Sequence, residues 1–153
     1  MTAAPREDLC LRPAARDELD DVLALYSRTG IGRETPSLAQ AQALFDRMQG
    51  DRGTDLLVAV DRAGRIVGTY LLLFMDKLSN PNVPVAVVED VVVAPDRQGA
   101  GIGATLMHDA MARARQRGCY KLMLSSNLKR RDAHRFYEQL GFSQHGVSFE
   151  VSL

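Results

Sequence analysis

The sequence contains no tryptophan and only two cysteines, Cys10 and Cys119, among its 153 residues. Both cysteines lie in or beside strand-like runs, where a buried free thiol is the usual outcome, so the sequence does not predict a disulfide framework. No known local signature surrounds either cysteine, which argues against a catalytic Cys-His pair. The three histidines are not spaced as a metal cluster, and we expect no metal site.

A net charge and a long apolar run are also missing. Because 19 basic residues balance 19 acidic residues, the chain lacks the charge pattern of proteins that bind nucleic acid or anionic membranes. No apolar run reaches 18 residues, and residues 1–11 lack the basic and apolar regions of a signal peptide. The length is close to that of a common single domain, so we expect one cytoplasmic domain, with its core over about residues 8–153, that acts on a small partner.

The segment from Val87 to Ala104, VVEDVVVAPDRQGAGIGA, is the most informative part of the sequence. Its β-branched run favours a buried strand at Val91, Val92 and Val93. Pro95 ends that strand, because proline has no N–H for the ladder. Beyond the strand, three alternately spaced glycines allow backbone N–H groups to converge on one anion.

These glycines are Gly99, Gly101 and Gly103, and a helix is expected to begin at about Ala100. The first-turn N–H groups of that helix have no intrahelical partner, and the helix dipole adds positive potential at the same end. One glycine is enough for a tight turn, whereas three of them before a helix predict a phosphate or pyrophosphate site. Side-chain donors at the rim of this site are Arg97 and Gln98.

Residues 99–104, GAGIGA, also fit the G-x-G-x-x-A form of a dinucleotide-binding fingerprint. A Rossmann unit places an acidic residue about 20 positions later to hold the ribose. Here the next strand ends in LMLSSN at Asn127, without a carboxylate, and only about 50 residues follow the loop. No Gly-Lys-Ser/Thr follows the glycines, so a P-loop is also excluded.

Residues 97–103, RQGAGIG, resemble the acyl-CoA signature Q/R-x-x-G-x-G/A of the GNAT superfamily of N-acetyltransferases, with Gln98, Gly101 and Gly103 on its defined positions. Residues 131–142, RDAHRFYEQLGF, are similar to the closing motif of that family, in which a helix carrying Phe-Tyr ends at Leu-Gly-Phe. Two motifs in the expected order, about 30 residues apart, are far more specific than either motif alone.

The resemblance implies an N-acetyltransferase that uses acetyl-CoA as acyl donor for a primary amine of a small molecule or peptide. In such an enzyme the second half of the valine strand pairs with the pantetheine arm and offers an N–H to the thioester oxygen, which requires a free strand edge. Asn127 would bind a pantetheine amide, unless it is only a strand-ending turn residue. The implied cofactor-binding residues are Val91, Val92, Val93, Arg97, Gln98, Gly99, Ala100, Gly101, Ile102, Gly103, Ala104, Asn127, Arg131 and Phe136.

Acetyl transfer requires that an amine lose its proton and that a departing thiolate be stabilised. By resemblance Tyr137 is the general acid, and a thiol near pKa 8.5 and a phenol near 10 differ so little that the transfer costs only about 2 kcal/mol. The alternative places Tyr137 in the core, like Phe136. Glu89 is the preferred general base and Asp90 the reserve, because adjacent strand residues point to opposite faces unless a bulge intervenes. The alternative to a general base is that the Glu89 carboxylate forms a salt bridge.

The order of expected elements agrees with the resemblance. Helices are expected over about residues 15–29, 37–49, 100–117 and 131–140, and strands at 9–12, 56–60, 66–75, the valine run and 120–124, with one or two more strands within 142–153. Residues 61–64, DRAG, form a hairpin signal between the second and third strands. We therefore predict an α/β fold of the GNAT type, with a mixed, splayed central sheet and helices on both faces.

The identity of the amine acceptor stays open. Its pocket would be shaped by residues 28–37 and 76–84 and by the tail around Phe149, where no motif is readable. The balanced charge argues mildly against strongly basic acceptors such as histone tails. Two other classes remain beside the enzyme: a non-catalytic acyl-CoA-binding module, and an NADP-binding protein that uses residues 129–131 for the 2′-phosphate. Homodimers are frequent in the family, and a homodimer is compatible with the sequence.

Overall fold

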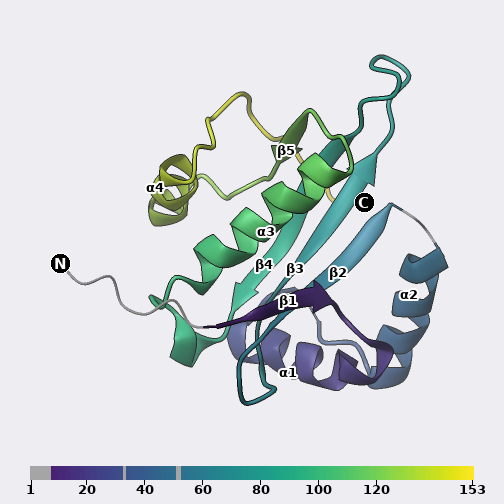
Figure 1. The fold of residues 1–153 in the computed structure, drawn as a ribbon, viewed down its shortest axis with the longest axis vertical. Coiled ribbons are helices and arrows are strands. Elements are labelled where there is room, and N and C mark those ends of the chain that lie inside the picture. The colour runs from purple at the N-terminus through teal and green to yellow at the C-terminus, as the bar shows by residue number, and fades with distance from the viewer. Residues whose placement is uncertain (1–7, 33, 51–52) are drawn as a thin grey trace. The chain divides into compact units, whose positions relative to one another are not determined.

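The computed structural model describes residues 8–32, 34–50 and 53–153, which fall into two compact units, Met1–Met123 and Leu124–Leu153 (Figure 1). The first unit holds the sheet, and its elements are β1 (Cys10–Pro13), the 3-10 helix η1 (Arg16–Glu18), α1 (Leu19–Thr29), α2 (Leu38–Gly50), β2 (Thr54–Val60), β3 (Ile66–Met75), β4 (Val85–Val93), the 3-10 helix η2 (Pro95–Arg97), α3 (Ile102–Gln116) and β5 (Lys121–Met123). The second unit holds α4 (Arg131–Gln139).

The sheet has the strand order β1-β2-β3-β4-β5. The first four strands form an antiparallel meander, and β5 pairs parallel to β4 after the α3 crossover. The β4–β5 ladder runs only from Val85↔Lys121 to Val87↔Met123. Among the described residues, no β5 residue therefore pairs with the second half of β4. The predicted mixed sheet with helices on both faces is confirmed.

Local signals fix the end of α1 and the start of α2, close to the residues expected from the sequence. Ser37 caps α2, because its Oγ accepts the N–H of Gln40 at 3.3 Å while Gln40 Oε1 accepts the N–H of Ser37 at 2.9 Å. This reciprocal pair is a capping box. Gly30 ends α1 in the left-handed region at φ 68, with its N–H donated to the Tyr26 carbonyl at 2.9 Å.

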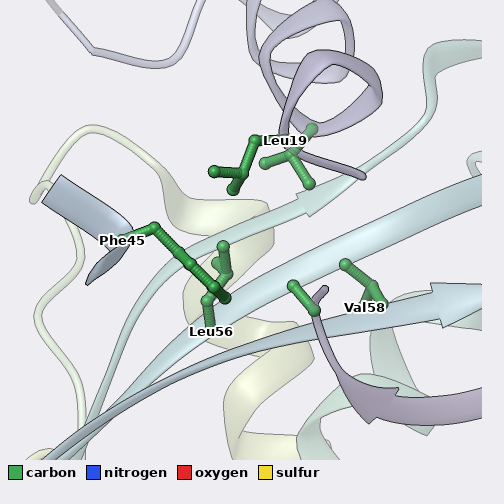
Figure 2. Close-up of a cluster of buried hydrophobic side chains, with 6 residues drawn as sticks. Leu19, Phe45, Leu56 and Val58 are labelled. Atoms are coloured by element: carbon green, nitrogen blue, oxygen red, sulfur yellow. The ribbon is translucent and has the colours of Figure 1, made fainter. Parts of the chain in front are cut away.

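A hydrophobic cluster joins α1 and α2 to one face of the sheet (Figure 2). Leu19 of α1 and Phe45 of α2 point toward Leu56 and Val58 of β2. Burying each such side chain contributes roughly 1.5–3 kcal/mol. This packing fixes α1 against the sheet and so places its C-terminal half beside β4.

Helix α3 covers the opposite face of the sheet (Figure 1). Gly68 of β3 allows this close approach, since a Cβ there would lie 3.1 Å from Leu106 Cδ1 of α3. The fully buried Tyr70 donates its hydroxyl to Asp109 Oδ2 at 2.6 Å, and Arg113 Nε donates to the same oxygen at 2.7 Å. The network satisfies polar groups that would be costly to bury alone. It also holds α3 against β3.

Two expectations from the sequence are wrong. Cys10 is exposed and Cys119 half-buried, so only the free state of the thiols was predicted correctly. Residues 142–153 contain no strand. Alternate apolar residues of this tail, from Val147 to Leu153, are 72–117% exposed, so the alternation is present without a ladder. Alternation alone does not make a strand, because a strand needs a partner for its backbone groups.

Candidate active site

The glycine loop that joins η2 to α3 has the predicted left-handed backbone at two of its three glycines, and the helix begins at Ile102 instead of about Ala100. Gly99 and Gly101 have φ of 81° and 82°, in the left-handed region that favours glycine. A Cβ built at either position would meet nothing within 4 Å. The third glycine, Gly103, lies within the first turn of α3. The loop is thus open to solvent on the side that a Cβ would occupy.

Three backbone donors converge at the start of α3. The first helical hydrogen bond runs from the Thr105 N–H to the Gly101 carbonyl at 3.1 Å. Within the described ranges, the N–H groups of Ile102, Gly103 and Ala104 have no protein acceptor. They lie at the positive end of the helix dipole, where an anion is stabilised. Because the donors are unpaired and the loop is open, this end of α3 fits a diphosphate.

Ion pairs hold η2, which leads into the glycine loop. Arg97, predicted as a donor at the rim, places Nη1 3.3 Å from Asp61 Oδ2 of the β2–β3 hairpin. Asp96 forms an exposed pair with Arg28 of α1 at 2.5 Å. The role of Arg97 at a phosphate stays a prediction, whereas its pairing with Asp61 is a contact that sequence reasoning missed.

A β-bulge interrupts β4 beside the two predicted carboxylates. The ladder with β3 pairs Leu71 with Glu89 but Thr69 with Val92, so one residue of β3 stands opposite two of β4. Asp90 takes φ 49, which is uncommon for a residue other than glycine. The bulge breaks the alternation that would send adjacent side chains to opposite faces. Glu89 and Asp90 are both exposed.

The electrostatics of the bulge involve α1. Partial burial raises the pKa of Glu89, and the neighbouring negative charge of Asp90 raises it further. Burial raises the pKa of Tyr26 to about 12, again with a smaller contribution from Asp90. Asp90 is therefore close enough to α1 to act on a tyrosine there. Nothing in the sequence around Tyr26 links it to the carboxylates of β4, because the two segments are more than 60 residues apart.

The second unit holds the predicted general acid. Tyr137 of α4 is half-buried, and its ring makes edge contacts with Phe136 and Phe142 at centroid distances of 5.2 and 5.8 Å. Arg131 is the exposed first residue of α4. These aromatic contacts fix the ring of Tyr137 within its unit.

Asn127 also lies in the second unit, where it forms a turn. Its Oδ1 accepts the N–H of Lys129 at 2.9 Å, and its carbonyl lies 2.9 Å from His134 Nε2. The side-chain oxygen is thus engaged, and binding of a pantetheine amide stays a prediction. The neighbouring Ser126 was missed from the sequence, yet its buried Oγ has no partner within the described residues.

The structure therefore brings one group of predicted residues together along a continuous stretch of the first unit. That group runs from Glu89 through the valines of β4 to the glycine loop and Ala104. Residues 19–142 match the model of the acetyltransferase (GNAT) family. The chain belongs to this family. Its members use acetyl-CoA as acyl donor, and the family match extends over parts of both units.

Individual GNAT proteins are similar to this chain over different lengths. Glucosamine 6-phosphate N-acetyltransferase of Trypanosoma brucei brucei is 43% identical over 90 residues, which are 59% of each chain. L-methionine sulfoximine/L-methionine sulfone acetyltransferase of Pseudomonas aeruginosa is 30% identical over 92% of this chain and 84% of its own. The crystal structure of a Trypanosoma brucei acetyltransferase superposes with a TM-score of 0.82 at 34% identity, over 95% of this chain and 100% of the other.

The described residues offer neither a membrane-spanning helix nor a cluster of metal ligands. None of their helices has the length and apolar character needed to cross a membrane. No group of three or more His, Cys, Asp or Glu side chains among them is arranged to hold a metal ion.

Proposed function

We propose that this protein is an acetyl-CoA-dependent N-acetyltransferase that acetylates the primary amine of a small polar molecule. One observation carries the proposal: the start of α3, with three unpaired N–H groups, follows after η2 and the glycine loop a strand that bears two exposed carboxylates at a bulge. The first feature suits an anion, and the second suits the removal of a proton.

Each unit by itself holds residues that suit a part of coenzyme A. The N–H groups of residues 102–104 would hold the diphosphate, with the loop from Arg97 to Gly101 around it. The second half of β4, without a β5 partner, would pair through Val91 and Val93 with the pantetheine arm. In the second unit, Asn127, Arg131 and Phe136 are the proposed further contacts, and Ser126 joins them because its buried hydroxyl is unpaired. When bound, acetyl-CoA supplies the thioester carbonyl.

Glu89 is the proposed general base. A base works best when its pKa lies near the operating pH, and the pKa of Glu89 is raised by partial burial. Its carboxylate accepts the proton of the amine, directly or through one water. The bulge keeps Asp90 as the alternative base. Tyr137 is the proposed general acid, and its hydroxyl donates a proton to the departing thiolate.

The relatives suggest the class of acceptor. Their names give glucosamine 6-phosphate in one case and L-methionine sulfoximine or sulfone in the other. Both are small primary amines with strongly polar oxygen groups. We therefore place a small polar amine ahead of a peptide N-terminus, and the choice between them is an outcome of the assay below.

Coenzyme A binding is tested by two glycine variants with the same backbone cost. Gly101→Ala puts a methyl group on the open side of the loop, whereas Gly118→Ala does so at the far end of α3, where φ is 74° and the space is also open. Each substitution should cost about 1 kcal/mol of unfolding free energy because of the left-handed backbone. In calorimetric titration with CoA, only Gly101→Ala should lose affinity, by about tenfold or more. Equal affinities of the two variants would contradict the site.

Turnover is tested by release of free thiol from acetyl-CoA with a panel of amines that includes amino sugar phosphates, amino acids and short peptides. Rapid thiol release with at least one small polar amine is expected. Binding of CoA without thiol release for any amine would favour a non-catalytic acyl-CoA-binding module. Protection against thermal unfolding by NADPH but not by CoA would favour the NADP-binding alternative, since a ligand at 100 times its Kd stabilises by about 2.7 kcal/mol.

A further inference from the structure

Asp61 stands at the β2–β3 hairpin, apart from the residues assigned above. Its side chain is only 4% exposed. Oδ1 accepts the N–H groups of Ala63 and Arg65, each at 2.9 Å, and these bonds close the turn in which Gly64 has φ 78. One carboxylate oxygen is therefore sufficient for the hairpin, and the second oxygen, Oδ2, faces other donors.

Those donors are two guanidinium groups. Arg65 donates to Oδ2 from Nε at 3.0 Å and from Nη2 at 2.8 Å, and Arg97 donates from Nη1 at 3.3 Å. The Arg65 side chain is 64% exposed, whereas that of Arg97 is 17% exposed. The pair with Arg97 is shielded from solvent on both sides, so water and salt screen it less than a surface pair.

Arg97 is the last residue of η2 and precedes the glycine loop directly. The backbone before it is fixed, because the Ala94 N–H donates to the Val67 carbonyl at 2.8 Å and the Arg97 N–H donates to the Ala94 carbonyl at 2.9 Å. The backbone after it is not packed in the same way, since a Cβ at Gly99 or Gly101 would meet nothing within 4 Å. The contact of the Arg97 side chain with Asp61 is thus made at the junction between the fixed backbone and the open loop.

A second side-chain contact of η2 is weaker. Arg28 and Asp96 form an ion pair, but both side chains are more than half exposed. Exposed pairs of this kind contribute little, because solvent screens them and both side chains lose conformational freedom. The direction in which the chain leaves η2 therefore depends more on the buried Asp61–Arg97 pair than on the exposed one.

We propose that Asp61 is a positioning residue for the coenzyme A diphosphate, which it does not touch: through Arg97 it fixes the course of the glycine loop and so the aim of the N–H groups at the start of α3. This inference rests on the proposed function. It assigns to the β2–β3 hairpin a part in cofactor affinity.

The test variant is Asp61→Asn, which keeps an oxygen for the Ala63 and Arg65 N–H groups but removes the charge that faces the guanidinium groups of Arg65 and Arg97. Its matched control is Asp46→Asn, because Asp46 forms an exposed ion pair with Arg16 between η1 and α2. Calorimetric titrations use CoA and pantetheine, which ends before the diphosphate. We expect Asp61→Asn to weaken CoA binding about tenfold, within the range of coupling between residues of one network, and to leave pantetheine affinity unchanged.

A second variant keeps the proposal testable if Asp61→Asn fails to fold. Arg97→Lys keeps the positive charge but loses the guanidinium Nη1 that contacts Asp61, so it should weaken CoA binding and spare pantetheine in the same way. In the double variant the two losses should not add, because either change alone disrupts the hydrogen bond between Arg97 Nη1 and Asp61 Oδ2.

The outcomes separate the inference from the proposed function. Should the wild-type protein fail to bind CoA, the proposed function falls and the role of Asp61 falls with it. Wild-type binding with equal CoA affinity in Asp61→Asn overturns the role of Asp61 alone. A parallel loss for CoA and pantetheine also overturns it, because that pattern indicates a general structural effect.

Discussion

The two halves of β4 belong to one strand but differ in pairing and burial. The first half, Val85 to Val88, pairs with β3 and in part with β5, and three of its four residues are buried. The second half, Glu89 to Val93, has no β5 partner among the described residues, carries two exposed carboxylates and is bulged at Asp90.

This difference shows how one strand contributes to the stability of the fold and also exposes groups for the proposed reaction. Regular pairing and burial stabilise the first half, whereas the second half keeps backbone groups and charges available. Bulges and uncommon backbone angles cost free energy and persist where the surrounding structure imposes them. We therefore expect substitutions in the second half to change catalysis and those in the first half to change stability.

The largest effect is expected at Glu89. Glu89→Gln keeps the shape of the side chain but removes the base, so kcat should fall by about a thousandfold, within the range typical of general base catalysis. The affinity for CoA should be unchanged in calorimetric titration. If Glu89→Gln keeps its kcat while Asp90→Asn loses it, the base is Asp90 and the preference for Glu89 is wrong.

The next largest effect is expected in the second unit, at Tyr137. Tyr137→Phe keeps the ring that contacts Phe136 and Phe142 and removes only the hydroxyl, so kcat should fall by about a hundredfold as the general acid is lost. Tyr120→Phe, at an exposed tyrosine, is the matched control and should keep its kcat. Equal rates for the two variants would show that Tyr137 serves packing alone.

In the first half of β4, Val88→Ala should act on stability. Val88 is 2% exposed, and its truncation should lower the free energy of unfolding by about 2 kcal/mol through lost burial and a new cavity. Urea denaturation measures the loss. The kcat and the KM for acetyl-CoA should stay within about twofold of the wild type, because Val88 lies in the half of β4 that carries none of the proposed contacts. A twofold change corresponds to well under 1.4 kcal/mol, the free energy of a tenfold change. A large change in kcat without loss of stability would erase the contrast between the two halves.

The smallest expected effect is a shift in pH dependence. Glu89 must be ionised to act, so kcat/KM should rise with pH through a pKa above the ordinary value of 4.5. Asp90→Asn removes the nearby negative charge that favours the protonated form of Glu89, so this limb should move to lower pH. It should not return to the ordinary value, because partial burial is the larger cause. An unmoved limb would show that the two carboxylates do not interact.

Sequence reasoning succeeded where the deciding physics is local. The left-handed backbone at Gly99 and Gly101 depends on a few adjacent residues. So do the bounds of the helices expected over about residues 15–29 and 37–49, which the structure shows at Leu19–Thr29 and Leu38–Gly50. The mixed sheet followed from the order of these elements and from the family resemblance.

Long-range features were not readable in the same way. The bulge at Asp90 depends on how β4 meets β3, and the pair between Asp61 and Arg97 joins residues 36 positions apart. The tail beyond Phe142 shows the converse error, since its alternation is visible in the sequence but the partner that a strand requires is not.

The most direct test of the central claim is a crystal structure of this protein with CoA bound. We expect the diphosphate oxygens to lie about 3 Å from the backbone nitrogens of Ile102, Gly103 and Ala104, as hydrogen bonds require. A diphosphate bound elsewhere, with these three N–H groups turned toward water, would contradict the assignment of the glycine loop.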